Sequence, residues 1–157
     1  MILKGLIDED FSNYKKASMI LFFPYCSFKC DIECGSQVCQ NSALASAKDI
    51  NISTDRIIER YLNNNLTTAI VCSGLEPFDT YYSLMRLVCK IREVSNDDII
   101  IYTGYDVEEI LDEINELSKY PNIIVKFGRF SPDSIKRYDD LLGIWLASDN
   151  QYAERIS

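Results

Sequence analysis

Residues 23–41 read FPYCSFKCDIECGSQVCQN, and this stretch holds four of the six cysteines of the chain, Cys26, Cys30, Cys34 and Cys39. Its first residue, Phe23, ends an apolar run at residues 19–23 that has the composition of a buried strand. Thiolates are the ligands that iron–sulfur clusters and zinc prefer, and a loop at the end of a strand allows several of them to converge. The sequence therefore predicts a metal centre in this loop.

Two other uses of these cysteines remain open. Structural zinc usually takes two pairs of thiols that are well separated along the chain, whereas here the cysteines form one cluster and histidine is absent. Disulfide bonds are typical of exported proteins, but residues 1–12 contain three acidic side chains and lack the apolar core of a signal peptide. We therefore favour an iron–sulfur centre over a four-thiolate zinc site, and we expect a cytoplasmic protein.

The composition indicates one globular domain over residues 1–157, with 47% hydrophobic and 25% charged residues. No apolar run approaches the roughly 20 residues that cross a membrane. The net charge of −8 argues against sequence-independent binding of nucleic acid, which depends on Lys and Arg at phosphates. We therefore expect neither nucleic acid nor a membrane among the partners.

Hydrophobic periodicity predicts alternating strands and helices after the cysteine loop. Helices are expected from residue 53 or 54 to about residue 64, after Asp79 and after Asp106, because apolar residues recur there at helical spacing. Residues 131–142 are polar and are expected to form a loop or a short helix. The expected strands are residues 2–7, 19–23, 68–72, 99–102, 123–127 and 144–147. This alternation favours a mainly parallel sheet with right-handed crossovers.

Unusual segments follow the carboxyl ends of these expected strands. Besides the cysteine loop, they read SGLEP at residues 73–77, TGY at 103–105, GRF at 128–130 and SDNQ at 148–151. The carboxyl ends of parallel strands lie at one edge of a sheet, and ligands bind there. We therefore expect these segments to form one cofactor site with a metal at its edge.

Six motifs occur in a characteristic order along the chain. They are Asp10-Phe11-Ser12-Asn13, Cys39-Gln40-Asn41, Gly74-Leu75-Glu76-Pro77, Tyr102-Thr103-Gly104-Tyr105, Gly128-Arg129-Phe130 and Ser148-Asp149-Asn150-Gln151. Together they resemble the motifs of the radical S-adenosylmethionine (radical SAM) superfamily. The resemblance is greatest to the small activating enzymes of anaerobic (class III) ribonucleotide reductase.

The cysteine loop departs from the superfamily's usual spacing, in which three and then two residues separate three cysteines. Here the intervals are three, three and four residues. The third cysteine of the family follows an apolar or aromatic residue and precedes Asn, a context that Cys39 has and Cys34 lacks. The resemblance therefore implies that Cys26, Cys30 and Cys39 are the metal ligands and that residues 31–38 form an expanded loop.

The resemblance also implies the cofactors, the reaction and the fold. A 4Fe-4S cluster would bind S-adenosyl-L-methionine, and reductive cleavage would give methionine and a 5′-deoxyadenosyl radical. That radical would install a glycyl radical on a partner, an anaerobic ribonucleotide reductase, with electrons from a reductant such as flavodoxin. The implied fold is α/β, a radical-SAM-like open or partial (β/α) barrel of mainly parallel strands. The residues expected to bind the cofactor are Asn41, Gly74, Leu75, Glu76, Pro77, Tyr102, Thr103, Gly104, Tyr105 and Arg129.

Two further functions are compatible with these residues. One is a radical enzyme that acts on a small molecule, and the other is a non-enzymatic metal-binding interaction module. Outside the metal centre, Cys72 lies in an expected strand and Cys89 on an expected helix, so both are expected to be packed, unreactive thiols. Cys34 is expected to be a spare thiol of the loop, and the alternative is that it is a metal ligand in a different register of the loop.

Overall fold

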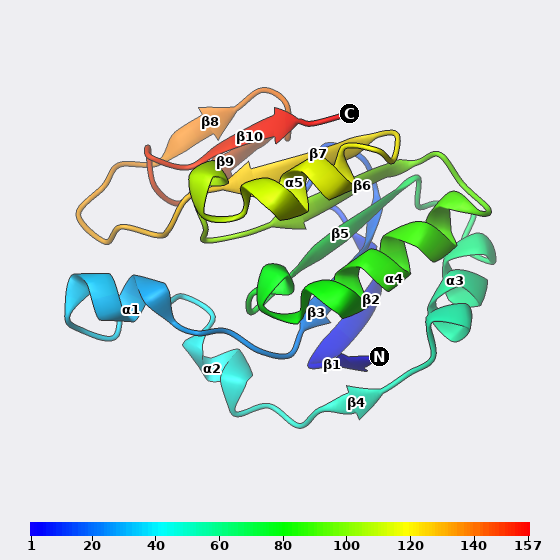
Figure 1. The fold of residues 1–157 in the computed structure, drawn as a ribbon, viewed down its shortest axis with the longest axis horizontal. Helices are drawn as coiled ribbons and strands as arrows, with labels where there is room; N and C mark the ends of the chain where they lie inside the picture. The colour runs from blue at the N-terminus through cyan, green and yellow to red at the C-terminus, as the bar shows by residue number, and fades with distance from the viewer.

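The computed structural model describes residues 1–157 and centres on a six-stranded sheet with the order β10-β7-β6-β5-β3-β2 (Figure 1). Four adjacent strands, β3, β5, β6 and β7, run parallel to one another. Both edge strands, β2 and β10, are antiparallel to their neighbours. The bounds of the strands are β2 (Gly5–Asp10), β3 (Ser18–Phe23), β5 (Ala69–Gly74), β6 (Asp98–Tyr102), β7 (Ile123–Phe127) and β10 (Tyr152–Arg155).

The expected barrel is wrong, because the sheet is open and mixed, with an antiparallel strand at each edge. Parallel strands need a crossover connection of about a dozen residues or more, whereas residues 11–17 alone join β2 to β3. After β7 the chain forms no further helix. It instead builds a separate hairpin from β8 (Arg137–Asp139) and β9 (Ile144–Leu146), and then returns antiparallel to β7 as β10. Residues 131–142 thus include a strand, where a loop or short helix was expected.

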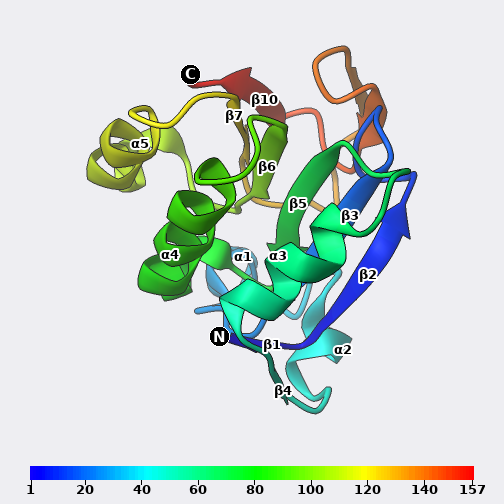
Figure 2. The ribbon, with the colours of Figure 1, turned by 90° about the vertical axis from the view of Figure 1, so that its right-hand side faces the viewer.

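The three longest helices cover one face of the sheet (Figure 2). They are α3 (Thr54–Leu62), α4 (Tyr81–Arg92) and α5 (Leu111–Leu117), and each lies close to its expected position. Ser53 caps α3 by accepting a hydrogen bond from the backbone of Arg56. The 3₁₀ helices η1 (Pro77–Thr80) and η2 (Val107–Glu109) precede α4 and α5, and the short strands β1 (Ile2–Leu3) and β4 (Ile50–Asn51) pair with each other.

Alternate residues of the central strands face opposite sides of the sheet, as strand geometry requires. The side chains toward the helices form the larger apolar core, which includes Cys72 with no exposed surface. On the other face a smaller core lies beneath the loop before β3 and the β8–β9 hairpin. Its members are Tyr14, Ile20, Ala69, Val71, Ile100, Ile124, Leu142 and Leu146. Nearer the carboxyl ends of the strands, this second face continues into Ser73, Tyr102 and Lys126, which line a pocket.

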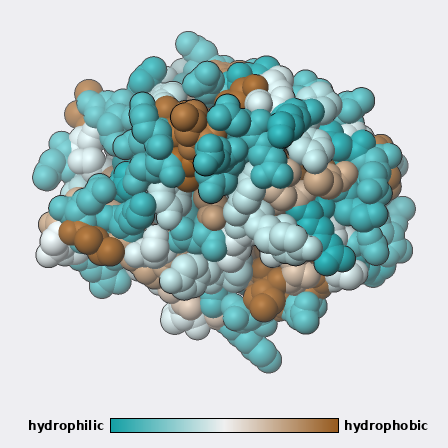
Figure 3. Space-filling view, viewed as in Figure 1, coloured by the Kyte–Doolittle hydropathy of each residue, from teal (hydrophilic) through white to brown (hydrophobic).

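The outer surface on the helix-covered side is mostly hydrophilic, with a few separate apolar patches (Figure 3). None of the helices is long and apolar enough to cross a membrane.

Candidate metal centre

The cysteine loop leaves the sheet after β3 and lies, with α1 (Lys29–Cys34) and α2 (Ser42–Ala45), at one end of the molecule (Figure 1). The backbone N–H of Phe28 donates to Cys26 Sγ at 3.2 Å. The carboxylate of Asp31, on α1, accepts hydrogen bonds from the backbone N–H groups of Val38 and Cys39, both at 2.8 Å. Asp31 therefore closes the expanded part of the loop and brings Cys39 back to the helix that carries the preceding cysteines.

Three of the four loop cysteines, Cys26, Cys30 and Cys39, line one cavity of about 120 Å³. Cys34 is exposed and lines none of the cavities of the molecule. Burial raises the pKa of the Cys26 thiol to about 12, and the charges of Glu76 and Asp79 raise it further. Burial also raises the pKa of the Cys30 thiol. Without a metal both thiols are protonated at neutral pH, so metal binding must displace their protons.

This donor set suits a cluster of several iron atoms. No three Cys, Asp or Glu side chains stand close enough together to hold a single metal ion. The three cysteines instead line one shared cavity, and a cluster suits such a site because its different iron atoms bind separate thiolates. A site with four thiolates would require Cys34 to move inward from its exposed position.

The segment after β5 packs tightly against β3 and forms part of the cavity wall. Gly74 has a φ of 91°, and a Cβ there would lie 2.7 Å from Phe22 Cα, so only glycine fits. Glu76 is 5% exposed and accepts hydrogen bonds from the backbone N–H groups of Gly104 at 2.8 Å and Phe78 at 3.1 Å. Burial raises the pKa of Glu76 to about 7, although these donors act to lower it.

The expected convergence of the segments at one edge of the sheet is confirmed. The residues that line the cavity of the three cysteines include Asn41, Leu75, Glu76, Tyr102, Thr103 and Gly104. Gly74 lines the adjoining larger pocket, Tyr105 and Arg129 line a narrow cleft together with Cys26 and Cys30, and Pro77 is buried at the start of η1. The chemical roles of these residues stay predictions.

The helix expected after Asp79 is present as α4, but its N-cap residue is Thr80 and Asp79 does not cap it. Its carboxylate instead accepts hydrogen bonds from the backbone N–H of Ser27 at 2.6 Å and from the Tyr105 hydroxyl at 2.5 Å. Asp79 therefore ties the beginning of the cysteine loop to the segment after β6.

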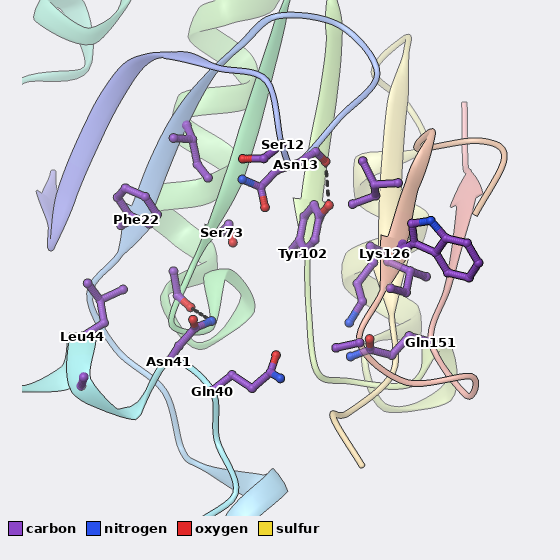
Figure 4. Close-up of a pocket in the computed structure, with 17 residues that line it drawn as sticks. Ser12, Asn13, Phe22, Gln40, Asn41, Leu44, Ser73, Tyr102, Lys126 and Gln151 are labelled. Atoms are coloured by element: carbon purple, nitrogen blue, oxygen red, sulfur yellow. Dashed lines mark hydrogen bonds between the residues drawn. The ribbon is translucent and has the colours of Figure 1, made fainter. Parts of the chain in front are cut away.

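A larger pocket of about 490 Å³ adjoins the cysteine cavity (Figure 4). The two cavities share Asn41, Ser73, Tyr102 and Lys126 in their walls. One wall of the pocket comes from β3 and residues 40–44, and the opposite wall comes from residues 144–147 of the hairpin segment. Its volume lies within the range of about 300–1,000 Å³ that is typical of small-molecule sites.

Lys126 lies where the two cavities meet, and the sequence analysis did not assign it to the site. It is 6% exposed and takes part in no ion pair, and its Nζ donates to the backbone oxygen of Gly128 at 2.9 Å. Burial lowers the pKa of Lys126 to about 8. In Figure 4 the Lys126 side chain lies on the same wall as Gln151, across the pocket from Phe22 and Leu44. One signal in the sequence was a lysine within the apolar strand IIVKF at residues 123–127.

The fold and the cysteine cavity define an iron–sulfur protein with an α/β sheet. A family model described as "4Fe-4S single cluster domain" matches residues 16–153, which is most of the chain, so the protein belongs to this family. No curated protein and no solved structure matches the chain. The 4Fe-4S cluster predicted from the cysteines agrees with the family, whereas its individual ligands and S-adenosyl-L-methionine stay predictions.

Proposed function

We propose that this protein is a radical S-adenosylmethionine enzyme that installs a glycyl radical on a partner protein, an anaerobic ribonucleotide reductase or a close relative. A single observation carries the proposal: two buried ionisable side chains, the acid Glu76 and the base Lys126, line the same cavity as Cys26, Cys30 and Cys39. A reduced 4Fe-4S cluster, when bound, supplies the electron that cleaves the sulfonium of S-adenosyl-L-methionine into methionine and a 5′-deoxyadenosyl radical.

Glu76 and Lys126 together form a receptor for a zwitterion. The methionine part of S-adenosyl-L-methionine carries an ammonium group and a carboxylate. Glu76 accepts two backbone hydrogen bonds and retains lone pairs for an ammonium group. Lys126 uses one of its three donors on Gly128 and retains two for a carboxylate. Hydrogen bonds to charged groups are about twice as strong as those between neutral groups, so this pair would fix the amino acid end beside the thiols.

The adjoining pocket is suited to the nucleoside. Tyr102 and Phe22 offer aromatic surface, and Gln40, Asn41 and Gln151 offer amide groups for a base or a ribose. Asn41 already donates one amide N–H to Gly74 O at 2.7 Å, so its side-chain oxygen and its second N–H remain for a ligand. With the methionine end at the thiols, the adenosine part would extend into this pocket, since the two cavities share a wall.

A protein substrate fits this site better than a second small molecule. One molecule of S-adenosyl-L-methionine would fill most of a pocket of about 490 Å³. The wall of that pocket includes Trp145, which is 65% exposed, so a partner could cover this side and exclude water from the radical. The net charge of −8 favours a partner surface that is rich in Lys and Arg.

The test begins with anaerobic reconstitution, reduction by dithionite and addition of S-adenosyl-L-methionine. The expected products are 5′-deoxyadenosine, measured by chromatography, and a glycyl doublet in the EPR spectrum once a competent reductase is present. If cluster-loaded protein binds the cofactor and forms no 5′-deoxyadenosine, the proposed chemistry is refuted. A silent spectrum with a competent reductase would reject that partner only, and turnover of a free metabolite would favour the small-molecule alternative.

Two variants probe the zwitterion receptor itself. Lys126→Met and Glu76→Gln should each weaken binding of S-adenosyl-L-methionine about tenfold to a hundredfold, because each leaves one charged group of the ligand without its partner. Lys119→Met is the matched control, since Lys119 is exposed, follows the end of α5 and lines neither cavity. Unchanged affinity in both site variants would contradict the assignment.

A further inference from the structure

Helix α1 (Lys29–Cys34) carries Cys30 but buries none of its side chains. An apolar core therefore does not fix this helix against the rest of the molecule. Its first turn also begins without a side-chain cap, since Phe28 at the N-cap makes no such hydrogen bond. Polar contacts must supply the attachment that holds Cys30 in the wall of the cavity.

Arg129, in the loop after β7, makes the central contact. Its side chain is 11% exposed and lies among three carboxylates. Nη2 is 2.7 Å from Glu109 Oε1, Nε is 3.1 Å from Glu33 Oε1, and Nη1 is 3.6 Å from Asp106 Oδ2. The contact with Glu33 lacks hydrogen-bond geometry and is therefore an ion pair. Glu33 belongs to α1, whereas Asp106 and Glu109 belong to the segment after β6, so Arg129 joins the two.

Lys29, at the N-terminal end of α1, forms a second ion pair with Glu109. Lys29 Nζ lies 3.1 Å from Glu109 Oε1 and 4.3 Å from the centre of the Tyr105 ring. Lys29 and Glu33 stand one turn apart on α1 and precede and follow Cys30. The hydrogen bond from Arg129, helped by those from the Asp106 backbone and Lys29, holds the pKa of Glu109 down to about 2, so this carboxylate is ionised at neutral pH.

The same arginine lies close to the sulfur of Cys30. A Cβ built on Gly104 would be 3.7 Å from both Arg129 Cγ and Cys30 Sγ, so these atoms approach one point. Arg129 and Cys30 also line the same narrow cleft. A movement of the arginine would therefore open the wall in which Cys30 lies.

We propose that Arg129 is a positioning residue of the metal centre, which holds Cys30 in its ligating place by clamping α1 to the segment after β6 through Glu33 and Glu109. This inference depends on Cys30 as a ligand and is independent of the reaction that the cluster serves. Because the clamp consists of partly exposed ion pairs, salt weakens it, in contrast to a hydrophobic attachment.

The first test uses the cluster-loaded full chain and measures the release of iron to a chelator. Arg129→Gln should release iron about tenfold faster than the wild type, since local opening of α1 exposes the ligands. Arg129→Lys keeps the charge and should recover part of the difference, and the EPR spectrum of the reduced cluster should change in Arg129→Gln. Added salt should accelerate release in the wild type and have little effect on Arg129→Gln. The control is Arg56→Gln, which removes an exposed ion pair with Glu59 on α3.

The second test separates local opening from general loss of stability in the metal-free chain. Iodoacetamide labelling followed by mass spectrometry reports Cys30 and the fully buried Cys72 separately. Arg129→Gln should raise the labelling rate of Cys30 about tenfold and leave that of Cys72 unchanged. If both cysteines react faster to the same extent, or if neither labelling nor iron release changes, the proposal is overturned.

Discussion

Replacement of Lys126 by methionine is expected to stabilise the metal-free protein, although this lysine lies in the proposed binding site. Lys126 is 6% exposed, has no ion-pair partner and makes one hydrogen bond, to Gly128 O. Burial lowers its pKa from 10.5 to about 8. Since one pKa unit corresponds to about 1.4 kcal/mol, the charged form costs about 3 kcal/mol in the folded state.

The change in the free energy of unfolding also includes the interactions that the methionine side chain loses and gains. Loss of the hydrogen bond to Gly128 costs about 1 kcal/mol, and the methionine side chain fills a similar space without a charge. We therefore expect Lys126→Met to raise the free energy of unfolding by about 2 kcal/mol at pH 7, while it weakens binding of a carboxylate ligand.

The dependence on pH gives this prediction a second check. Between pH 8 and 10.5 the unfolded chain holds the lysine proton more strongly than the folded chain does, so wild-type stability rises with pH over that interval. The cost of the buried charge is fully present below pH 8 and disappears above pH 10.5. The advantage of Lys126→Met over the wild type should therefore shrink as the pH rises.

Urea unfolding of both proteins under reducing conditions, at pH 7 and again near the upper end of that interval, measures the effect. Lys119→Met serves as the control for loss of an exposed lysine. A variant that is less stable than the wild type at pH 7, or an advantage that does not change with pH, would refute the reasoning.

Three other predictions follow from single residues. Cys39→Ala should lose iron on anaerobic reconstitution, whereas Cys34→Ala should keep it. The opposite result in metal analysis would identify Cys34, and not Cys39, as the ligand. Gly74→Ala should lower the free energy of unfolding by about 3 kcal/mol or more, from a positive φ and contact with the backbone of β3; unchanged urea unfolding would contradict this. Asp98→Asn should cost about 2 kcal/mol at pH 7. Its partners hold the pKa of Asp98 below 3.8, so the difference from the wild type should shrink as the pH falls below that value, and a constant difference would count against it. These partners are Lys16, Arg155 and Tyr14.

The sequence predicted the four parallel strands and the helices between them because their signals are local. Apolar runs of strand length alternate with helical periodicity, and Ser53 and the Asp106–Glu109 capping box mark two helix starts. The direction of the edge strands was not predicted, because it depends on connections without a helix at residues 11–17 and 128–151. A short apolar run such as residues 144–147 also does not reveal which sheet it joins, and here it joins a separate hairpin.

The meeting of the site segments was predictable from one rule, that loops after parallel strands share an edge of the sheet. The spacing of the cysteines does not show why Cys26, Cys30 and Cys39 line the cavity, because this depends on the path of the backbone between Cys30 and Cys39. Gly35 ends α1 in a left-handed conformation, and Asp31 then draws the backbone of Cys39 toward the helix. Cys34, at the last turn of α1, is thereby left exposed. The extra residues of the loop thus form a helical turn that leaves Cys34 at the surface and brings Cys39 back to the cavity.

Lys126 and Arg129 show why the type of residue alone does not give its role. Both are basic, stand three positions apart and lie beside the cysteines. Arg129 has carboxylates around its guanidinium, so its charge is used within the protein. Lys126 is more deeply buried, forms no ion pair with the Glu76 carboxylate that lines the same cavity, and retains two donors. A buried cation without an ion-pair partner destabilises the fold unless a ligand supplies the negative charge. The unpaired charge of Lys126 therefore favours this residue, rather than Arg129, as the one that binds the carboxylate of a cofactor.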